Sequence, residues 1–222
     1  MVTIIPAVLQ LNKETLESEI ERMSMISPFL HIDVTGALVD GEAVTFDAGA
    51  LEEVLSNDIL GLQYQVHFML TPDELRQWIP PLLDCDTVSA MIIHHEIGSA
   101  EVLSFAEMVR SNNKSVIVAI NPDTAVDVVD EYIGQVDGVM VMGVVPGAQG
   151  NPFEASTFDR VAELHRKFPQ LSITVDGAVS LEDERAQKLA KSGAESLVVG
   201  SKIRDARDPQ AVYDAFAAAV NQ

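Results

Sequence analysis

A chain of 222 residues with 47% hydrophobic and 5% aromatic residues is long enough for one large domain with an aliphatic core and short for two. Its 34 acidic and 14 basic residues give a net charge of −20, which argues against nucleic acid and anionic membranes as partners. No apolar stretch approaches the roughly 20 residues that span a bilayer, and the first residues lack the basic segment of a secretion signal. A single cysteine, Cys85, excludes an internal disulfide framework and fits a reducing cytoplasm. We therefore expect one cytoplasmic globular domain over residues 1–222.

Eight short apolar runs rich in β-branched residues alternate with longer amphipathic segments. The predicted strands are Thr3–Val8, Phe29–Val34, Gly61–Phe68, Thr87–Ile93, Ser115–Ile120, Gly138–Met142, Leu171–Val175 and Ser196–Val199. The helical patterns between them are Lys13–Met25, Asp47–Leu55, Pro72–Ile79, Ala100–Arg110, Thr124–Ile133, Ala155–Lys167, Leu181–Ser192 and Pro209–Val220.

Several of the predicted strands are apolar on both faces. The segments Val116–Ile120 and Val139–Met142 contain no polar residue, which is typical of parallel strands covered on both sides. Eight strand–helix units in this length, roughly 28 residues each, predict a (β/α)8 TIM barrel of one domain. A doubly wound open sheet is the alternative. It would need a glycine-rich turn after the first strand, where the chain has Pro6-Ala7-Val8-Leu9-Gln10.

Polar side chains stand at the carboxyl ends of several predicted strands. His31 and Asp33 are two residues apart and therefore share one face of the second strand. His67 ends the third strand and Asp176 follows the seventh. His94 and Glu96 stand at the end of the fourth strand, and Asn121 at the end of the fifth. In a barrel these ends form one rim, from which catalytic groups come. Two histidines and two carboxylates match a site for a divalent metal ion such as Zn, Mn, Fe or Co.

The last three strands are followed by glycine-containing turns. Gly177 and Ala178 follow the seventh strand and Gly200 and Ser201 the eighth, where barrels commonly bind phosphate through backbone amides. The Pro146–Gly150 segment after the sixth strand includes Gly147 and is suited to closing over a ligand. The predicted substrate- or phosphate-binding residues are these five: Gly147, Gly177, Ala178, Gly200 and Ser201.

At these positions the chain resembles the ribulose-phosphate 3-epimerase family from Ile5 to about Ile203. The segments that match family motifs are Pro6-Ala7-Val8-Leu9, His31-Ile32-Asp33-Val34, Val66-His67-Phe68-Met69, His94-His95-Glu96, Asn121-Pro122-Asp123-Thr124, Met142-Gly143-Val144-Val145-Pro146-Gly147, Val175-Asp176-Gly177 and Gly200-Ser201.

The resemblance implies a metal-dependent enzyme of carbohydrate metabolism in the pentose phosphate pathway, which interconverts ribulose 5-phosphate and xylulose 5-phosphate. His31, Asp33, His67 and Asp176 would bind the divalent metal, and the two aspartates would also be the acid–base pair. Removing the weakly acidic proton at carbon 3 and returning one on the opposite face suits two carboxylates, with a metal stabilising the enediolate. Met69 and Met142 would cover the enediolate with apolar, polarisable groups. A homo-oligomer is expected.

The departures from the family pattern cluster at this predicted site. Ala7 replaces a serine, the segment after Asp33 lacks a methionine and an aspartate and is one residue shorter at Thr35, and Ala178 replaces the second glycine of Asp-Gly-Gly. The loop after the sixth strand also differs from the family sequence. The altered loops favour an epimerase for another ketose phosphate, such as allulose 6-phosphate, as a second reading. Ala7 and Ala178 favour a third, a protein that binds metal or phosphate without turnover. A decarboxylase of the orotidylate type is disfavoured, because Asp33 is not followed by Asp-x-Lys-x-x-Asp.

Overall fold

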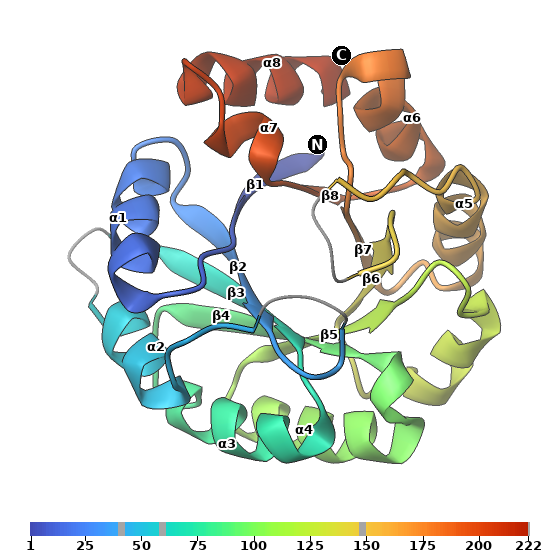
Figure 1. Cartoon of the computed structure of the whole chain (residues 1–222). Coiled ribbons are helices and arrows are strands. Elements are labelled where there is room, and N and C mark those ends of the chain that lie inside the picture. The colour runs from blue at the N-terminus through green and yellow to red at the C-terminus, as the bar shows by residue number, and fades with distance from the viewer. Residues whose placement is uncertain (40–42, 58–60, 147–149, 222) are drawn as a thin grey trace.

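A closed barrel of eight parallel strands forms the centre of the molecule (Figure 1). The computed structural model describes residues 1–39, 43–57, 61–146 and 150–221. The strands are β1 (Thr3–Val8), β2 (Phe29–Thr35), β3 (Gln63–Met69), β4 (Val88–His94), β5 (Ser115–Ile120), β6 (Gly138–Met142), β7 (Ser172–Asp176) and β8 (Ser196–Val199). Each strand pairs with the next, and β8 closes the barrel on β1 with Thr3 opposite Ser196 and Pro6 opposite Val199. The predicted (β/α)8 fold is confirmed.

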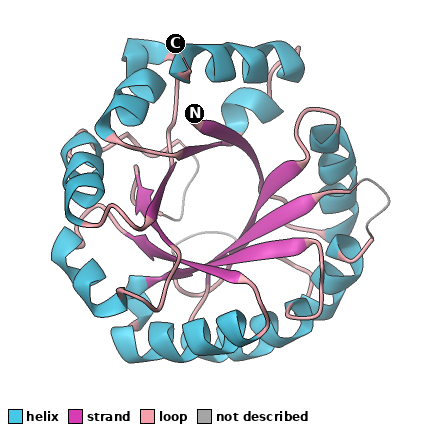
Figure 2. Ribbon diagram, turned by 180° about the vertical axis from the view of Figure 1, so that it is seen from behind, coloured by secondary structure: helices cyan, strands magenta, loops and turns pink. Residues whose placement is uncertain are grey.

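Helices surround this barrel, as the view from behind in Figure 2 also shows. The α-helices are α1 (Lys13–Ser24), α2 (Ala48–Leu55), α3 (Pro72–Leu82), α4 (Ser99–Ser111), α5 (Thr157–Lys167), α6 (Arg185–Ser192), α7 (Ser201–Arg204) and α8 (Pro209–Val220). Short 3-10 helices are η1 (His95–Ile97), η2 (Val126–Tyr132) and η3 (Glu182–Glu184). Among the described residues, no helix has both the length and the apolar character to cross a membrane.

The alternation of side chains along each strand divides the core in two. In β4, Met91 and Ile93 point outward and pack in the layer between barrel and helices. Ala90 and Ile92 point inward, into a smaller apolar cluster inside the barrel. Because both faces are buried, every strand needs apolar residues on both, which explains the uninterrupted apolar runs. The inward positions at the carboxyl ends of the strands are therefore the places where polar residues have a use other than packing.

Two predicted helices differ from the structure. Within the predicted helix 124–133 the chain forms the 3-10 helix η2 instead, over Val126–Tyr132, and its buried residues Val126, Val129 and Tyr132 recur at every third position, the period of a 3-10 helix. The prediction of one helix over 181–192 was wrong at its start. Asp183 and Glu184 adopt left-handed backbone with φ of 54° and 55°, so that η3 and α6 are separate. The amide of Ala186 donates to the carbonyl oxygen of Ser180 at 2.9 Å across this bend.

Candidate metal and anion site

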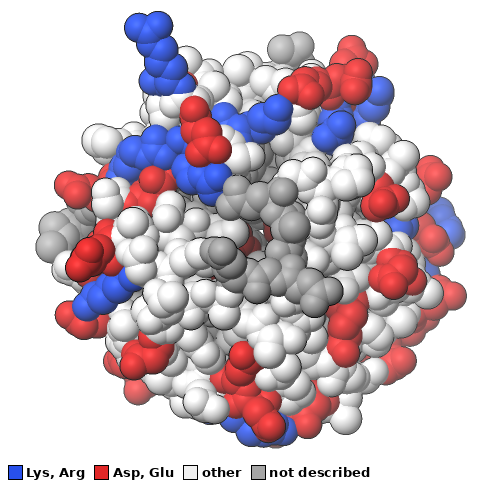
Figure 3. All heavy atoms as spheres, in the orientation of Figure 1, with Lys and Arg blue, Asp and Glu red and all other residues white. Residues whose placement is uncertain are grey.

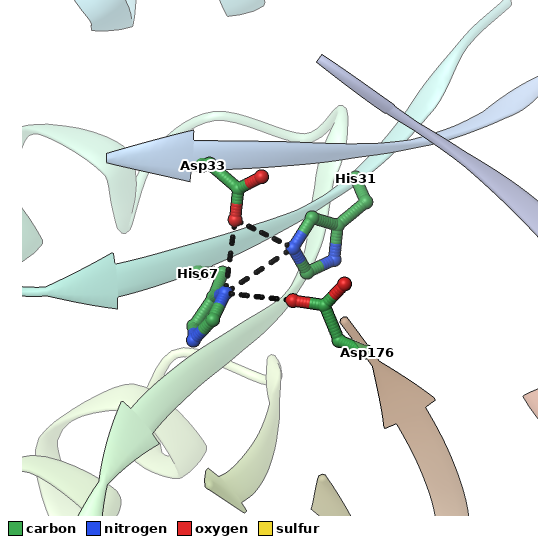
Figure 4. A group of neighbouring side chains, drawn as sticks. All are labelled: His31, Asp33, His67 and Asp176. Atoms are coloured by element: carbon green, nitrogen blue, oxygen red, sulfur yellow. Dashed lines mark hydrogen bonds and ion pairs between the residues drawn. The ribbon is translucent and has the colours of Figure 1, made fainter. Parts of the chain in front are cut away.

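Polar residues occupy inward positions of β2, β3 and β7. His31 and Asp33 lie on the inner face of β2, since their neighbours Leu30, Ile32 and Val34 pack outward. The parallel register places His31 opposite Gln65 and Asp33 opposite His67 on β3. Asp176, the last residue of β7, approaches the same point (Figure 4). The structure thus brings together the four residues that the sequence proposed as metal ligands.

The four side chains approach one another closely, as the dashed lines in Figure 4 show. His67 Nδ1 lies 2.9 Å from Asp33 Oδ1, 3.3 Å from His31 Nε2 and 3.7 Å from Asp176 Oδ2. His31 Nε2 lies 3.0 Å from Asp33 Oδ1. The histidine side chains are fully buried, whereas the Asp33 and Asp176 side chains remain 12% and 17% exposed. Two carboxylates therefore keep access to solvent, and the imidazoles form the floor beneath them.

The electrostatic environment separates the two carboxyl groups. Burial alone would raise the pKa of Asp33, but the charge of His31 and a hydrogen bond with His31 lower it well below its usual range. Burial and the nearby charge of Asp33 raise the pKa of Asp176. Burial opposes the protonation of His31, yet the charge of Asp33 and its hydrogen bond raise the pKa of this imidazole. A divalent cation among these groups would lower the pKa of both carboxyl groups.

The donor set fits a divalent metal ion. Each residue offers one ligand atom, and these four atoms lie within 4.8 Å of one another. Two ligand atoms of one ion cannot be farther apart than twice the metal–ligand bond, roughly 4.4 Å for bonds of about 2.2 Å. Only small side-chain movements separate the described arrangement from coordination. Imidazole nitrogens and carboxylate oxygens suit Zn, Mn, Fe or Co.

A cavity of about 970 Å³ opens over this cluster at the carboxyl ends of the strands. Asp33, Asp176, Met69 and Met142 line it, together with the two turns after β7 and β8. Of the five residues predicted to bind substrate or its phosphate, four line the cavity: Gly177, Ala178, Gly200 and Ser201. The fifth, Gly147, lies outside the described residues. Ala7 also lines the cavity, so the departure from the family serine removes a hydroxyl group from its wall.

The backbone conformation of the turn after β7 favours glycine at both of its first two positions. Gly177 has a φ of 99°, and a Cβ there would lie 2.7 Å from Val144 Cγ2. Ala178 has a φ of 51°, a left-handed conformation that costs a residue with a Cβ about 1 kcal/mol. Arg185 donates from Nη1 to the carbonyl oxygen of Ala178 at 2.6 Å, and its guanidinium lies 4.6 Å from the centre of the Phe153 ring. These contacts hold the turn although alanine replaces glycine.

Sequence reasoning missed several polar residues of this region. Arg185, Lys202 and Arg204 line the cavity beside the turns, although they come from two different helices. The side-chain amide of Gln65 lies 2.7 Å from His31 Nδ1. The sequence offered one signal for this residue: Gln65 is two residues before His67 and therefore shares its face of the strand. His94 and Glu96 were noted at a strand end without a role. They lie behind His67, on the side away from the cluster.

Comparison with known proteins relates the chain to one family. The model of the ribulose-phosphate 3 epimerase family matches residues 3–204. A ribulose-phosphate 3-epimerase from Eremothecium gossypii is 32% identical over 149 residues, which are 67% of this chain and 60% of that protein. One from Schizosaccharomyces pombe is 29% identical over 221 residues, covering 94% of this chain and 90% of that protein. The cytoplasmic isoform of ribulose-phosphate 3-epimerase from Oryza sativa subsp. japonica is 27% identical over 220 residues, covering 96% of this chain and 92% of that protein.

Solved structures share the barrel at much lower identity. KGPDC from Streptococcus mutans superposes with a TM-score of 0.76 at 11% identity, covering 99% of this chain and 97% of that one. An orotidine 5'-monophosphate decarboxylase from Methanocaldococcus jannaschii gives 0.72 at 14% identity, with complete coverage of both chains. At such identities the likeness shows the fold alone.

Proposed function

Because the chain belongs to the ribulose-phosphate 3-epimerase family, we propose that it is a metal-dependent epimerase that inverts carbon 3 of a phosphorylated ketose. Ribulose 5-phosphate is the proposed substrate and xylulose 5-phosphate the product. One observation supports this proposal above all: the carboxyl groups of Asp33 and Asp176, from β2 and β7, reach one cavity beside two buried imidazoles. This arrangement supplies two groups that exchange protons and a place for a cation between them.

In the proposed reaction, Asp33 and Asp176 act on opposite faces of the ketose. One aspartate, as the carboxylate, removes the proton from carbon 3, and the other, as the carboxylic acid, donates its proton to the opposite face, so the configuration inverts and the two groups exchange protonation states. A divalent ion held by His31, Asp33, His67 and Asp176 would supply positive charge that stabilises the enediolate. Met69 and Met142, which are 7% and 3% exposed, line the cavity and keep water from the planar intermediate.

The phosphate group is proposed to bind at the turns after β7 and β8. Backbone amides at Gly177, Ala178, Gly200 and Ser201 would donate to its oxygens. A chain with a net charge of −20 repels an anion at long range, so attraction has to be local. Figure 3 shows Lys and Arg side chains gathered over α7, beside the central hollow. The cations that line the cavity among the described residues are Arg185, Lys202 and Arg204.

Lys202 provides a test of this anion site. Its Nζ lies 2.7 Å from Glu182 Oε1, and both side chains are more than half exposed. Lys202→Ala removes one cation and leaves the Glu182 charge uncompensated. We expect the KM for the ketose phosphate to rise roughly 2–5-fold with little change in kcat, and the effect to shrink at high salt. Arg166→Ala makes the same change in net charge on the exposed surface of α5. An equal rise in KM for both variants would contradict a local anion site.

Proton exchange at carbon 3 tests the function directly. Protein loaded in turn with Zn, Mn, Fe or Co is incubated with ribulose 5-phosphate in D2O, and NMR follows the loss of the carbon 3 proton. We expect exchange that EDTA abolishes and added metal restores. Fully loaded protein that exchanges no proton on any ketose phosphate would overturn the enzymatic function. It would favour a protein that binds metal or phosphate without turnover. Ala7, Ala178 and the Thr35 segment would then be the positions at which catalytic activity was lost.

A larger ketose phosphate is the second candidate substrate. The cavity of about 970 Å³ has room for one more carbon, and Thr35, in the segment that departs from the family pattern, lines its wall. Allulose 6-phosphate is the matching six-carbon compound. The ratio of kcat/KM for the two ketose phosphates, measured with the same metal, decides between them.

A further inference from the structure

A row of buried polar groups lies behind His67, on the side away from the cavity. Figure 4 shows the second ring nitrogen of His67 pointing away from the other three side chains. This atom, Nε2, lies 2.9 Å from Nε2 of His94, and the two rings stack with centres 5.0 Å apart. His94 is 1% exposed, and its Nδ1 lies 3.0 Å from Glu96 Oε2. Three side chains thus form a continuous hydrogen-bonded row.

Glu96 is anchored at the far end of this row. Its Oε1 accepts hydrogen bonds from the Asn121 backbone amide at 3.0 Å and from the Thr124 hydroxyl at 2.5 Å. Burial opposes ionisation, but hydrogen bonds from His94, Thr124 and Asn121 lower the pKa of Glu96 to about 2. The carboxylate is therefore ionised at neutral pH and can only accept hydrogen bonds.

The positions of the protons follow from this anchor. An ionised Glu96 requires a proton on Nδ1 of His94. A neutral His94 then carries a lone pair on Nε2, and the 2.9 Å contact requires that His67 donate from its own Nε2. His67 Nδ1 is left with a lone pair directed at His31, Asp33 and Asp176. Only such a lone pair can bind a metal ion.

We propose that Glu96 and His94 are positioning residues, which hold the proton of His67 on Nε2 and so keep Nδ1 ready to bind the metal. This inference rests on the metal site of the proposed function and goes beyond it, because neither residue touches the metal or the substrate. The row supplies no proton to the ketose. It selects one tautomer and one ring orientation of a ligand, and an apolar side chain in place of His94 would do neither.

Metal affinity in the absence of substrate tests the proposal. The affinity for Zn²⁺ alone is measured by competition with a chelator for the wild type, His94→Phe, His94→Gln and His95→Gln. His94→Phe keeps a ring but no acceptor, and we expect it to weaken Zn²⁺ binding about 10–100-fold. His94→Gln restores an acceptor oxygen and should stay within a few-fold of the wild type. His95 is the matched control, since it contacts Tyr132 Oη at 2.6 Å outside the row. Equal affinities for His94→Phe and His95→Gln would overturn the proposal.

A spectroscopic measurement on the wild type avoids any question of misfolded variants. Long-range proton–nitrogen NMR of the metal-free protein should show the His67 proton on Nε2 before any metal binds Nδ1, and a proton on Nδ1 would overturn the proposal. The outcomes also separate this inference from the proposed function. Tight zinc binding with the expected tautomer but without carbon 3 exchange would reject the epimerase and retain the positioning role. Wild-type protein that binds no divalent metal would reject both.

Discussion

Replacing Asp176 by asparagine is expected to lower the rate of net epimerisation by about 10²–10⁴-fold or more. An amide cannot cycle a proton, although it keeps the shape and one oxygen of the carboxylate, and losing a positioned acid or base typically has this effect. A group that also holds the metal adds a further loss. Asp33→Asn should have the same effect, because in the proposed mechanism each aspartate serves one face of the substrate. The measurement is the steady-state conversion of ribulose 5-phosphate to xylulose 5-phosphate.

The partial reactions of these variants distinguish the roles of the two aspartates. In Asp176→Asn, Asp33 can still exchange the proton on its own face with D2O without inverting the centre, so isotope exchange should outlast epimerisation. Asp159→Asn makes the same chemical change on the exposed first turn of α5 and should keep the wild-type rate. Wild-type epimerisation in either Asp33→Asn or Asp176→Asn would disprove the two-carboxylate mechanism.

Removing divalent metal is expected to abolish turnover and to lower the stability of the fold. A metal that binds only the folded protein, present at 100 times its Kd, raises the free energy of unfolding by about 2.7 kcal/mol. For a chain of this size the corresponding rise in Tm is roughly 5–11 °C. Calorimetry of EDTA-treated protein, before and after addition of each metal, measures this rise.

The proposed ligand residues predict which variants lose the metal-induced rise in Tm. His31→Ala removes one buried imidazole of the four-residue group and should show little or no rise. His165→Ala alters an exposed histidine of α5 and should behave as the wild type. A metal-induced rise of equal size in both variants would place the metal elsewhere.

The fold and the convergence of the four proposed ligands followed from one property of parallel strands. Strands buried on both faces are apolar throughout, so His31, Asp33 and His67 interrupt their pattern visibly. Once eight strands are assigned to a barrel, the carboxyl ends must meet at one rim. The structure places Asp176 beside the other three for this reason, although more than 100 residues separate it from His67.

Features that depend on the register of neighbouring strands, or on how helices align with them, could not be predicted from the sequence. The contact of His94 with His67 rather than with the solvent follows from the β3–β4 pairing, which includes a shift of register between Tyr64 and Gln65. Arg185, the first residue of α6, and Lys202 line one cavity, and Arg185 follows two left-handed residues, Asp183 and Glu184, that ordinary propensity does not predict. Local patterns carry no information on such alignments.

The closure of β8 on β1 has a consequence for how this protein is made. Thr3 pairs with Ser196, near the end of the chain. During synthesis the edge of β1 that faces β8 therefore stays unpaired until nearly the whole barrel has been made. An apolar strand with an unpaired edge invites pairing with other chains. Pro6 stands in the middle of β1 and has no N–H to donate, so a foreign strand finds an interrupted ladder there. The native neighbour β8 accommodates this gap opposite Val199, and the same proline that weakens β1 as a template for aggregation is tolerated in the finished barrel.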